Sequence, residues 1–261
     1  MIDLLLIITA IWLFAASVTD IKKTEVSDWL SFSLLAIALA FNLSKGIISG
    51  DFSSLWASLL GVVVFFIIAN ILYYGKLFAG GDAKILISLG AVIPSPAFLS
   101  NILVFGSIYG ILYSLFLALR YWKPFWNEFK KYKKLMIYFL IPSVLIALLY
   151  FATSMIMLLI FAAIVFFMPL LFVTVNSVEK SCLIRKVEPE KLMLGDWLFK
   201  DVKAKGKIIK ADFEGLTKRD IALIRKSGKK VFIKYGIPFI PVFLIAFLVT
   251  VFAGNILTIF I

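Results

Sequence analysis

Two aspartates lie at the ends of apolar runs and are the residues best placed to do chemistry. Asp20 closes the first apolar run, and Asp82 directly precedes another run that begins at Ala83. Two carboxylates that converge on one water cannot both ionise easily, so they share a proton. One can then act as a general base on the water while the other polarises a carbonyl group. This pattern is typical of an aspartic catalytic pair, if the two segments meet in the fold.

Each acid also has an ordinary structural explanation. Asp82 could be the N-cap of the following helix, with Gly80 and Gly81 making the preceding turn. Asp20 could be an interfacial acid that pairs with the lysines just after it. In the catalytic interpretation the two glycines have another role, because residues without side chains let a second backbone approach closely. The residue types alone leave both interpretations open.

The sequence lacks histidine and contains one cysteine, Cys182. The absence of histidine excludes HExxH zinc proteases, Ser-His-Asp hydrolases and histidine-dependent intramembrane serine proteases. A single cysteine excludes an intramolecular disulfide and a CxxC metal site. Catalysis must therefore rest on Asp, Glu, Lys, Ser, Thr or Tyr, or on a metal held by oxygen atoms. We expect no metal and no cofactor.

The elements that carry these acids are predicted to be membrane helices. Hydrophobic residues make up 62% of the 261 residues, and the mean hydropathy is +1.05, values typical of a membrane protein. A span needs about 20 mostly apolar residues. The predicted class is mainly α, a polytopic helical membrane protein of six to eight spans with a small α+β cytoplasmic domain. The candidate spans are Ile2–Thr19, Leu30–Leu43, Leu55–Tyr74, Ala83–Ile93 with an extension toward Leu99, Ile102–Leu119, Met136–Phe151, Met155–Val175 and Ile237–Ile261.

The distribution of basic residues predicts the orientation. Alternating crossings place Lys22, Lys84, the stretch Arg120–Lys134 and the basic segment Asn176–Gly236 on one side, which the positive-inside rule makes cytoplasmic. Because the first basic residues follow the first apolar run, a cleaved signal peptide is not expected. The bias accounts for most of the net charge of +12, so we expect membrane lipids as partners and no nucleic acid. The predicted location is the cell membrane, with the active site and the soluble domain facing the cytoplasm.

Changes in composition predict five parts of the chain. They are a membrane core with both aspartates at 1–120, a basic cytoplasmic loop at 121–135, a transmembrane hairpin at 136–175, a small soluble domain at 176–236 and a C-terminal transmembrane helix at 237–261. In the soluble domain, Gly206–Phe213 and Lys229–Lys234 are predicted strands. Thr217 is the predicted N-cap of an intervening helix that ends at Gly228.

Three stretches resemble the type IV prepilin peptidases, which are aspartic membrane proteases named for a GxGD motif. They are "TDIKKTEVSDWL" (Thr19–Leu30), "AGGDAK" (Ala79–Lys84) and "IKYGIPFIPVFLIAF" (Ile233–Phe247). The last stretch, after a basic module, is similar to the archaeal branch, the preflagellin peptidases. The resemblance implies that Asp20 and Asp82 are the catalytic pair.

The resemblance also gives roles to the neighbouring residues. Gly81 matches the second glycine of GxGD, but Ala79 stands where the first should be, and alanine lacks the access of glycine to positive φ. Lys84 matches a lysine often seen two residues beyond the aspartate, which could hold the charge of the pair or, as we favour, anchor the loop at the lipid surface. Asp28 matches a polar position with a structural role.

The implied activity is a membrane-embedded aspartic endopeptidase. It would remove a basic leader from preflagellin- or prepilin-like precursors, just before their hydrophobic helix and at the cytoplasmic face. The cysteine-rich insertion of bacterial members is missing, which argues against zinc and against N-methyltransferase activity. Two alternatives remain: an ion- or proton-coupled transporter that uses Asp20 and Asp82, and a non-catalytic assembly factor of a pilus or flagellum. The sequence predicts no particular oligomeric state.

Overall fold

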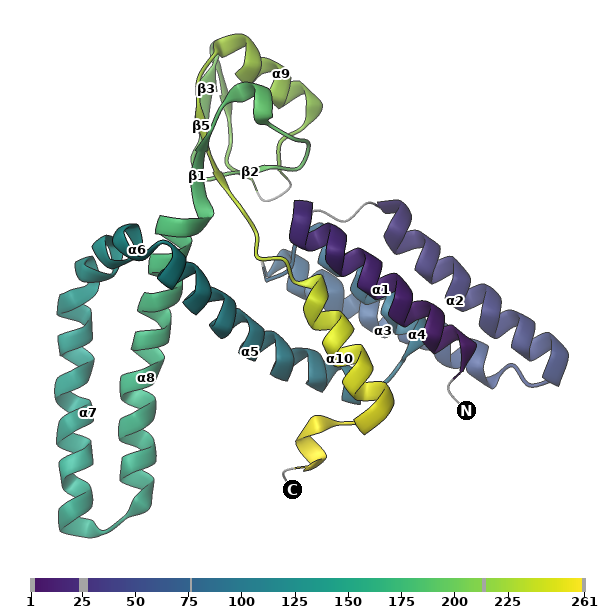
Figure 1. Cartoon of the computed structure of the whole chain (residues 1–261), viewed down its shortest axis with the longest axis horizontal. Coiled ribbons are helices and arrows are strands. Elements are labelled where there is room, and N and C mark those ends of the chain that lie inside the picture. Colours follow the sequence, from purple (N-terminus) through teal and green to yellow (C-terminus); the bar gives the residue numbers. More distant parts are fainter. Residues whose placement is uncertain (1–2, 24–27, 76, 213–214, 260–261) are drawn as a thin grey trace. The chain divides into compact units, whose positions relative to one another are not determined.

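The computed structural model describes residues 3–23, 28–75, 77–212 and 215–259. The chain divides into two compact units (Figure 1). Residues 1–110 and 236–261 form the first, here called the core unit, and residues 111–235 form the second, here called the inserted unit. The core unit is therefore built from both ends of the sequence.

The helices of the core unit pack around a short central one. Helix α4 contacts α1, α2 and α3, while α1 also packs against α10. The bounds are α1 Leu4–Lys23, α2 Asp28–Ser49, α3 Ser53–Tyr74, α4 Gly80–Val92, α5 Pro96–Arg120, α10 Ile240–Ala253 and the 3₁₀ turn η4 Ile256–Ile259, with α5 continuing into the inserted unit. Ile85, Leu86 and Leu89 of α4 are buried in the shared core.

The predicted fold class is confirmed: this is a polytopic helical membrane protein with a small strand-containing region. Among the described residues, six helices are long and apolar enough to cross a membrane. They are Leu4–Lys22, Asp28–Ser49, Ser53–Tyr74, Pro96–Arg120, Trp122–Thr153 and Ile156–Leu183.

Two of the eight candidate spans form short helices. Helix α4 lies close to the predicted Ala83–Ile93 without the extension toward Leu99, whereas α10 is shorter than the predicted Ile237–Ile261. Helix α4 has 13 residues and α10 has 14, which at 1.5 Å per residue gives about 20 Å, against a hydrocarbon thickness of about 30 Å. Pro94 stops α4, because a proline disfavours helical backbone in the residue before it. Helix α10 begins only at Ile240, and Gly254, with a φ of 72°, ends it.

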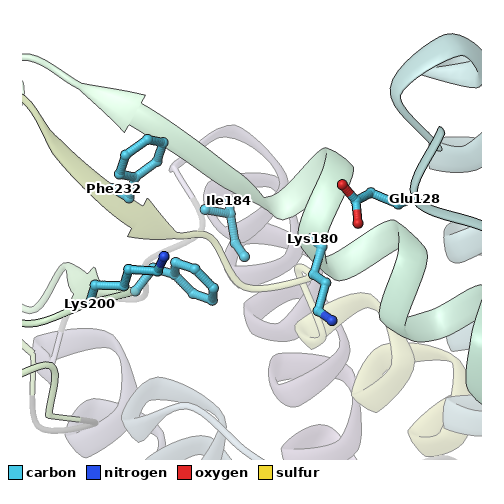
Figure 2. A pocket seen from close by; sticks show the side chains of 6 residues that line it. Glu128, Lys180, Ile184, Lys200 and Phe232 are labelled. Atoms are coloured by element: carbon cyan, nitrogen blue, oxygen red, sulfur yellow. The ribbon is translucent and has the colours of Figure 1, made fainter. Parts of the chain in front are cut away.

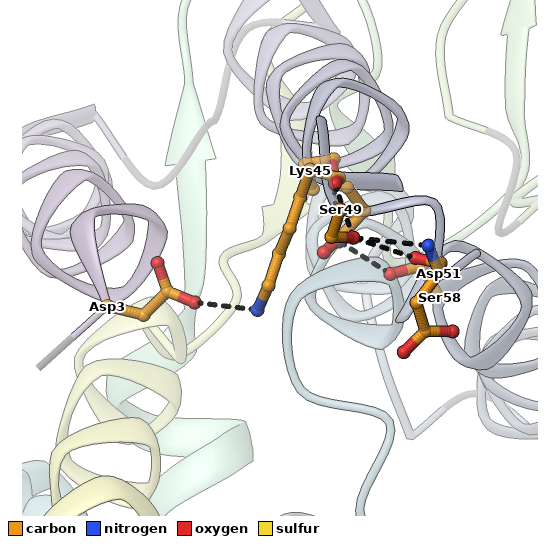
Figure 3. A network of polar contacts seen from close by, with 7 residues as sticks. Asp3, Lys45, Ser49, Asp51 and Ser58 are labelled. Carbon is orange, nitrogen blue, oxygen red and sulfur yellow. Dashed lines mark hydrogen bonds and ion pairs between the residues drawn. The ribbon is translucent and has the colours of Figure 1, made fainter. Parts of the chain in front are cut away.

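Polar contacts fix the end of the core unit at which α1 begins. Lys45 of α2 pairs with Asp3, just before α1, at 3.7 Å. In the α2–α3 connection, the carboxylate of Asp51 accepts the N–H of Ser53 at 2.8 Å, and the hydroxyl of Ser49 accepts the N–H of Asp51 at 3.2 Å (Figure 3). Asp20 lies near the opposite end of α1.

Asn101 of α5 ties that helix to the last turn of α10. Its side-chain amide donates to the hydroxyl of Thr250 and to the carbonyl of Gly254, both at 2.8 Å. Its carbonyl accepts the N–H of Ile256 at 3.0 Å. These bonds satisfy polar groups inside an apolar packing, so the short helix α10 is fixed at its C-terminal end.

The inserted unit contains a helical hairpin and a small α+β domain. Helices α7 (Lys133–Thr153) and α8 (Ile156–Val178) pack together and turn at Ser154, which has a φ of 55°. After α8 come η2 Glu179–Leu183, β1 Ile184–Val187, η3 Pro189–Lys191, β2 Trp197–Leu198, β3 Val202–Ala204, β4 Lys207–Ile209, α9 Lys218–Ser227 and β5 Val231–Lys234.

The strands of this domain form two antiparallel sheets. One has the order β1-β5-β2, with Ile184 opposite Lys234, and the other pairs β3 with β4, with Val202 opposite Ile209. The predicted cap of α9 is confirmed, because the Thr217 hydroxyl accepts the N–H of Asp220 and Gly228 ends the helix with a φ of 64°. The predicted strands are found in shorter form as β4 and β5, while Phe213 lies outside the described residues. The sequence analysis missed β1, β2 and β3.

The segment 121–135, predicted as a loop, is instead largely helical. Helix α6 (Trp122–Phe129) is followed by the 3₁₀ turn η1 (Lys130–Tyr132). Phe125 is buried, whereas the stacked rings of Trp122 and Trp126, 5.3 Å apart, are exposed. Apolar side chains three and four residues apart share one helix face, so the basic charges between them do not prevent a helix.

We predict that Gly61→Ala destabilises the core unit. A Cβ at Gly61 would lie 2.1 Å from the carbonyl oxygen of Gly90, so α3 and α4 would have to separate. Overpacking costs roughly 1–3 kcal/mol, equivalent to a fall in Tm of roughly 2–12 °C for a chain of this size. Thermal unfolding of purified protein in detergent measures the fall in Tm. Gly110→Ala is the control, because nothing lies within 4 Å of a Cβ there. An equal Tm in both variants would contradict the close approach.

Candidate active site

Asp20 is a buried acid that holds the start of α10. It lies three residues before the end of α1 and is 5% exposed. Its carboxylate accepts the backbone N–H of Ile240, the first residue of α10, at 3.0 Å. The first N–H groups of a helix have no partner within the helix, and a carboxylate suits the positive end of the helix dipole. The bond therefore stabilises both the buried carboxylate of α1 and the first turn of α10.

The alternative in which Asp20 pairs with the lysines just after it is not seen where the structure can test it. No ion pair between described side chains involves Asp20, and Lys22 is exposed. The side chain of Lys23 lies outside the described residues. Instead of a lysine, the partner of Asp20 is a backbone donor from a segment 220 residues away.

Asp82 stabilises the first turn of α4. Its carboxylate accepts the N–H of Ala79 at 3.1 Å. Ala79 is the N-cap and Asp82 is the third helical residue, so this bond is the half of a capping box in which the acid reaches back. Alanine has no side-chain acceptor to complete the other half. Asp82 thus stabilises the start of the helix, as the structural explanation expected, but it does so from the third helical position and not as the N-cap.

The alanine in place of the first motif glycine causes no strain. Ala79 has a φ of −74° and a ψ of 161°, the extended backbone usual for an N-cap and accessible to any residue. Gly80 and Gly81 are the first two residues of α4. The close backbone approach expected beside them is not found at Gly80, where a Cβ would meet the ring of Tyr73 at an ordinary 3.8 Å.

The helices that carry the two aspartates meet in the core unit. Helix α1, which contains Asp20 three residues before its end, contacts α4, which contains Asp82 in its first turn. Among the described residues, no hydrogen bond joins the two carboxylates. Two like charges so placed favour a state in which the pair retains one proton. The arrangement can supply one basic and one acidic carboxyl group to the same small volume.

Lys84 and Asp28 form an ion pair that joins α4 to the start of α2. Lys84 is therefore engaged by Asp28, and neither Asp20 nor Asp82 forms an ion pair with it among the described contacts. A second bond links the same helices, because the hydroxyl of Ser88 donates to the carbonyl of Ser31 at 2.7 Å. The pair thus has a structural role in placing α4, and that role fits the one implied for Asp28.

Three residues that the sequence analysis did not single out complete the site. The ring of Phe78, directly before Ala79, lies 5.1 Å from that of Phe239 and 5.8 Å from that of Phe243. Phe239 in turn precedes Ile240, the donor to Asp20. The sequence contained a signal for Phe239 and Phe243, because both lie in the stretch Ile233–Phe247. Nothing in that stretch indicates which residues they contact.

One pocket among the described residues is lined by none of the predicted site residues. It belongs to the inserted unit and has a volume of about 280 Å³. Its lining combines apolar side chains with one acid and two lysines (Figure 2): Glu128, Lys180, Ile184, Phe199, Lys200 and Phe232. Among the described residues, no group of three His, Cys, Asp or Glu side chains is placed to hold a metal ion.

Comparison with known proteins places part of the chain beside a family of peptidases. Residues 7–121 match the type IV leader peptidase family. The chain is 35% identical to the preflagellin peptidase of Methanococcus maripaludis over 88 residues, 34% of this chain and 38% of that protein. It is 33% identical to the preflagellin peptidase of Methanococcus voltae over 86 residues, 33% of this chain and 36% of that protein.

A third relative is similar over a comparable length. The preflagellin peptidase of Methanocaldococcus jannaschii is 33% identical over 88 residues, 34% of this chain and 37% of that protein. The chain thus matches less than two-fifths of the length of each of these relatives. No solved structure matches significantly. The predicted resemblance is therefore confirmed over residues 7–121, a segment that includes Asp20 and Asp82 and matches the type IV leader peptidase family.

Proposed function

We propose that this protein is a membrane-embedded aspartic endopeptidase that removes the basic leader from preflagellin- or prepilin-like precursors. The observation that carries the proposal is that α1, which contains Asp20 near its end, packs in one core against α4, which contains Asp82 in its first turn. The family match over residues 7–121 and the preflagellin peptidases among the relatives support the reaction and the substrate class. N-methyltransferase activity forms no part of the proposal.

The proposed mechanism uses the pair with one shared proton. The ionised carboxylate takes a proton from a water as the water attacks the scissile carbonyl, while the protonated carboxyl donates a hydrogen bond to the carbonyl oxygen. The proton gained by the base then passes to the leaving amine as the C–N bond breaks. In this mechanism the two carboxylates close around the substrate, as in other enzymes that close before reaction.

The position of the acids favours a protease over a transporter. Asp20 lies near the end of α1, and Asp82 lies in the first turn of α4. A transport site is expected near the middle of the membrane, whereas a precursor would be cut at the boundary between its polar leader and its apolar helix. The basic residues on the same side support a cytoplasmic active site, and anionic lipids are proposed as the surrounding surface.

We expect Asp20→Asn and Asp82→Asn each to abolish cleavage. Asparagine keeps an oxygen that can accept the N–H of Ile240 or Ala79, so each variant retains its structural bond and loses only the ionisable group. Removal of a general acid or base lowers the rate by about 10²–10⁴-fold. The measurement is cleavage, by purified protein in detergent, of a precursor with a basic leader before an apolar helix.

The matched control is Asp3→Asn, which removes a carboxylate near the opposite end of α1. Its side chain is exposed and pairs only at 3.7 Å with Lys45, so cleavage should stay within about twofold of the unchanged protein. Normal cleavage by either folded dyad variant would reject the catalytic pair. A proton flux in proteoliposomes that needs both acids, without any cleavage, would favour the transporter.

The ion pair between Lys84 and Asp28 should affect activity only through the placement of α4. Lys84→Met and Asp28→Asn are expected to lower the cleavage rate modestly and by similar factors, because each breaks the same contact. The double variant should be no worse than either single variant, as in a double-mutant cycle of directly interacting residues. Additive losses would contradict the pairing, and a loss as large as that of Asp82→Asn for Lys84→Met alone would place the ammonium in the chemistry.

A further inference from the structure

The start of α10 contacts both halves of the candidate site. On one side, the backbone N–H of Ile240 donates to the carboxylate of Asp20 at 3.0 Å. Ile240 is fully buried, and Asp20 is nearly so. This bond is therefore shielded from competing water and fixes the direction of the carboxylate at the end of α1.

On the other side, Phe239 packs against the segment that leads into Asp82. Its ring lies 5.1 Å from that of Phe78, and Phe243, one turn further along α10, lies 5.8 Å from the same ring in an edge-on arrangement. Ring pairs at these separations contribute about 0.5–1.5 kcal/mol beyond the area they bury. Phe78 directly precedes Ala79, whose N–H donates to Asp82. One aromatic cluster therefore sits against the turn that presents the second acid.

We propose that Phe239 and the N–H of Ile240 are positioning groups that set the separation of the two carboxylates. This inference rests on the proposed function, although the distance it concerns can be measured without any cleavage. Neither group touches the reacting atoms. Ile240 holds Asp20, and the adjacent Phe239 packs against the Phe78 segment. Displacement of the Phe239 ring relative to Ile240 therefore moves the segment before Asp82 while Asp20 keeps its bond.

A glycine of α5 provides the means to shift Phe239 without touching either acid. A Cβ at Gly106 would lie 2.9 Å from Cζ of Phe239, which is closer than real Cβ contacts, so the ring must move. Gly110 lies one turn along the same helix, and nothing lies within 4 Å of a Cβ there. Both Gly→Ala changes raise helix propensity to a similar extent. The two variants therefore differ mainly in whether the new methyl group displaces the ring of Phe239.

Two readouts compare Gly106→Ala with Gly110→Ala. The first is the split between kcat and KM for precursor cleavage. We expect Gly106→Ala to lower kcat by about 10- to 100-fold with little change in KM, because small misplacements of catalytic groups are costly, whereas Gly110→Ala should leave both constants unchanged. Phe239→Leu, which removes the ring but keeps an apolar side chain, should lower kcat in the same way and serves if Gly106→Ala does not fold.

The second readout is the distance between nitroxide labels beside the two acids. Ile21 and Leu77 are exposed, and Ile21→Cys/Leu77→Cys in a Cys182→Ser background labels both segments while keeping Asp20 and Asp82. The distance distribution should shift or broaden with Gly106→Ala and stay unchanged with Gly110→Ala. An unchanged distribution with Gly106→Ala and with Phe239→Leu would overturn the proposal, whatever happens to kcat. A shifted distribution in a protein that cleaves no precursor would support the positioning role and reject the proposed function.

Discussion

The bond between the N–H of Ile240 and the carboxylate of Asp20 gives a hydrogen-bond partner to two buried polar groups at once. A carboxylate removed from water is strongly destabilising unless it is hydrogen-bonded, and the first N–H groups of a helix lack partners within the helix. The first residue of α10 donates a hydrogen bond to the buried carboxylate of Asp20, and Asp20 accepts one from an N–H that has no partner within the helix. Since α1 and α10 come from opposite ends of the chain, the same bond also closes the core unit.

Helix α4 obeys a different constraint, because it is held by neighbouring helices on several sides. Glycines at 61 and 90 allow α3 to approach it closely, while Ser88 and Lys84 bond to α2. A helix so enclosed can be short, since its ends meet protein and need not span the hydrocarbon layer. Asp82 is consequently carried by the most enclosed helix of the core, and Asp20 by the packed pair α1 and α10.

Much of this architecture could be predicted from the sequence, for a physical reason. The long helices are marked by apolar runs, and Asp20 and Asp82 stand out because acids beside such runs are costly. Helix α6 was missed although Trp122, Phe125, Trp126 and Phe129 follow helical spacing, because the basic residues within and beside this segment suggested a loop. The donor at Ile240 could not be predicted, since a backbone N–H carries no signature in the side chain that bears it.

The origin of the core unit from both ends of the chain has a consequence for biosynthesis. After Asp20 is added to the growing chain, 220 further residues must be added before Ile240 exists, which takes roughly 10–45 s at a rate of 5–20 residues per second. During this interval Asp82 is made as well, so a nascent chain already contains both acids. It lacks the helix start that binds Asp20, and the site can be completed only after Ile240 has been added.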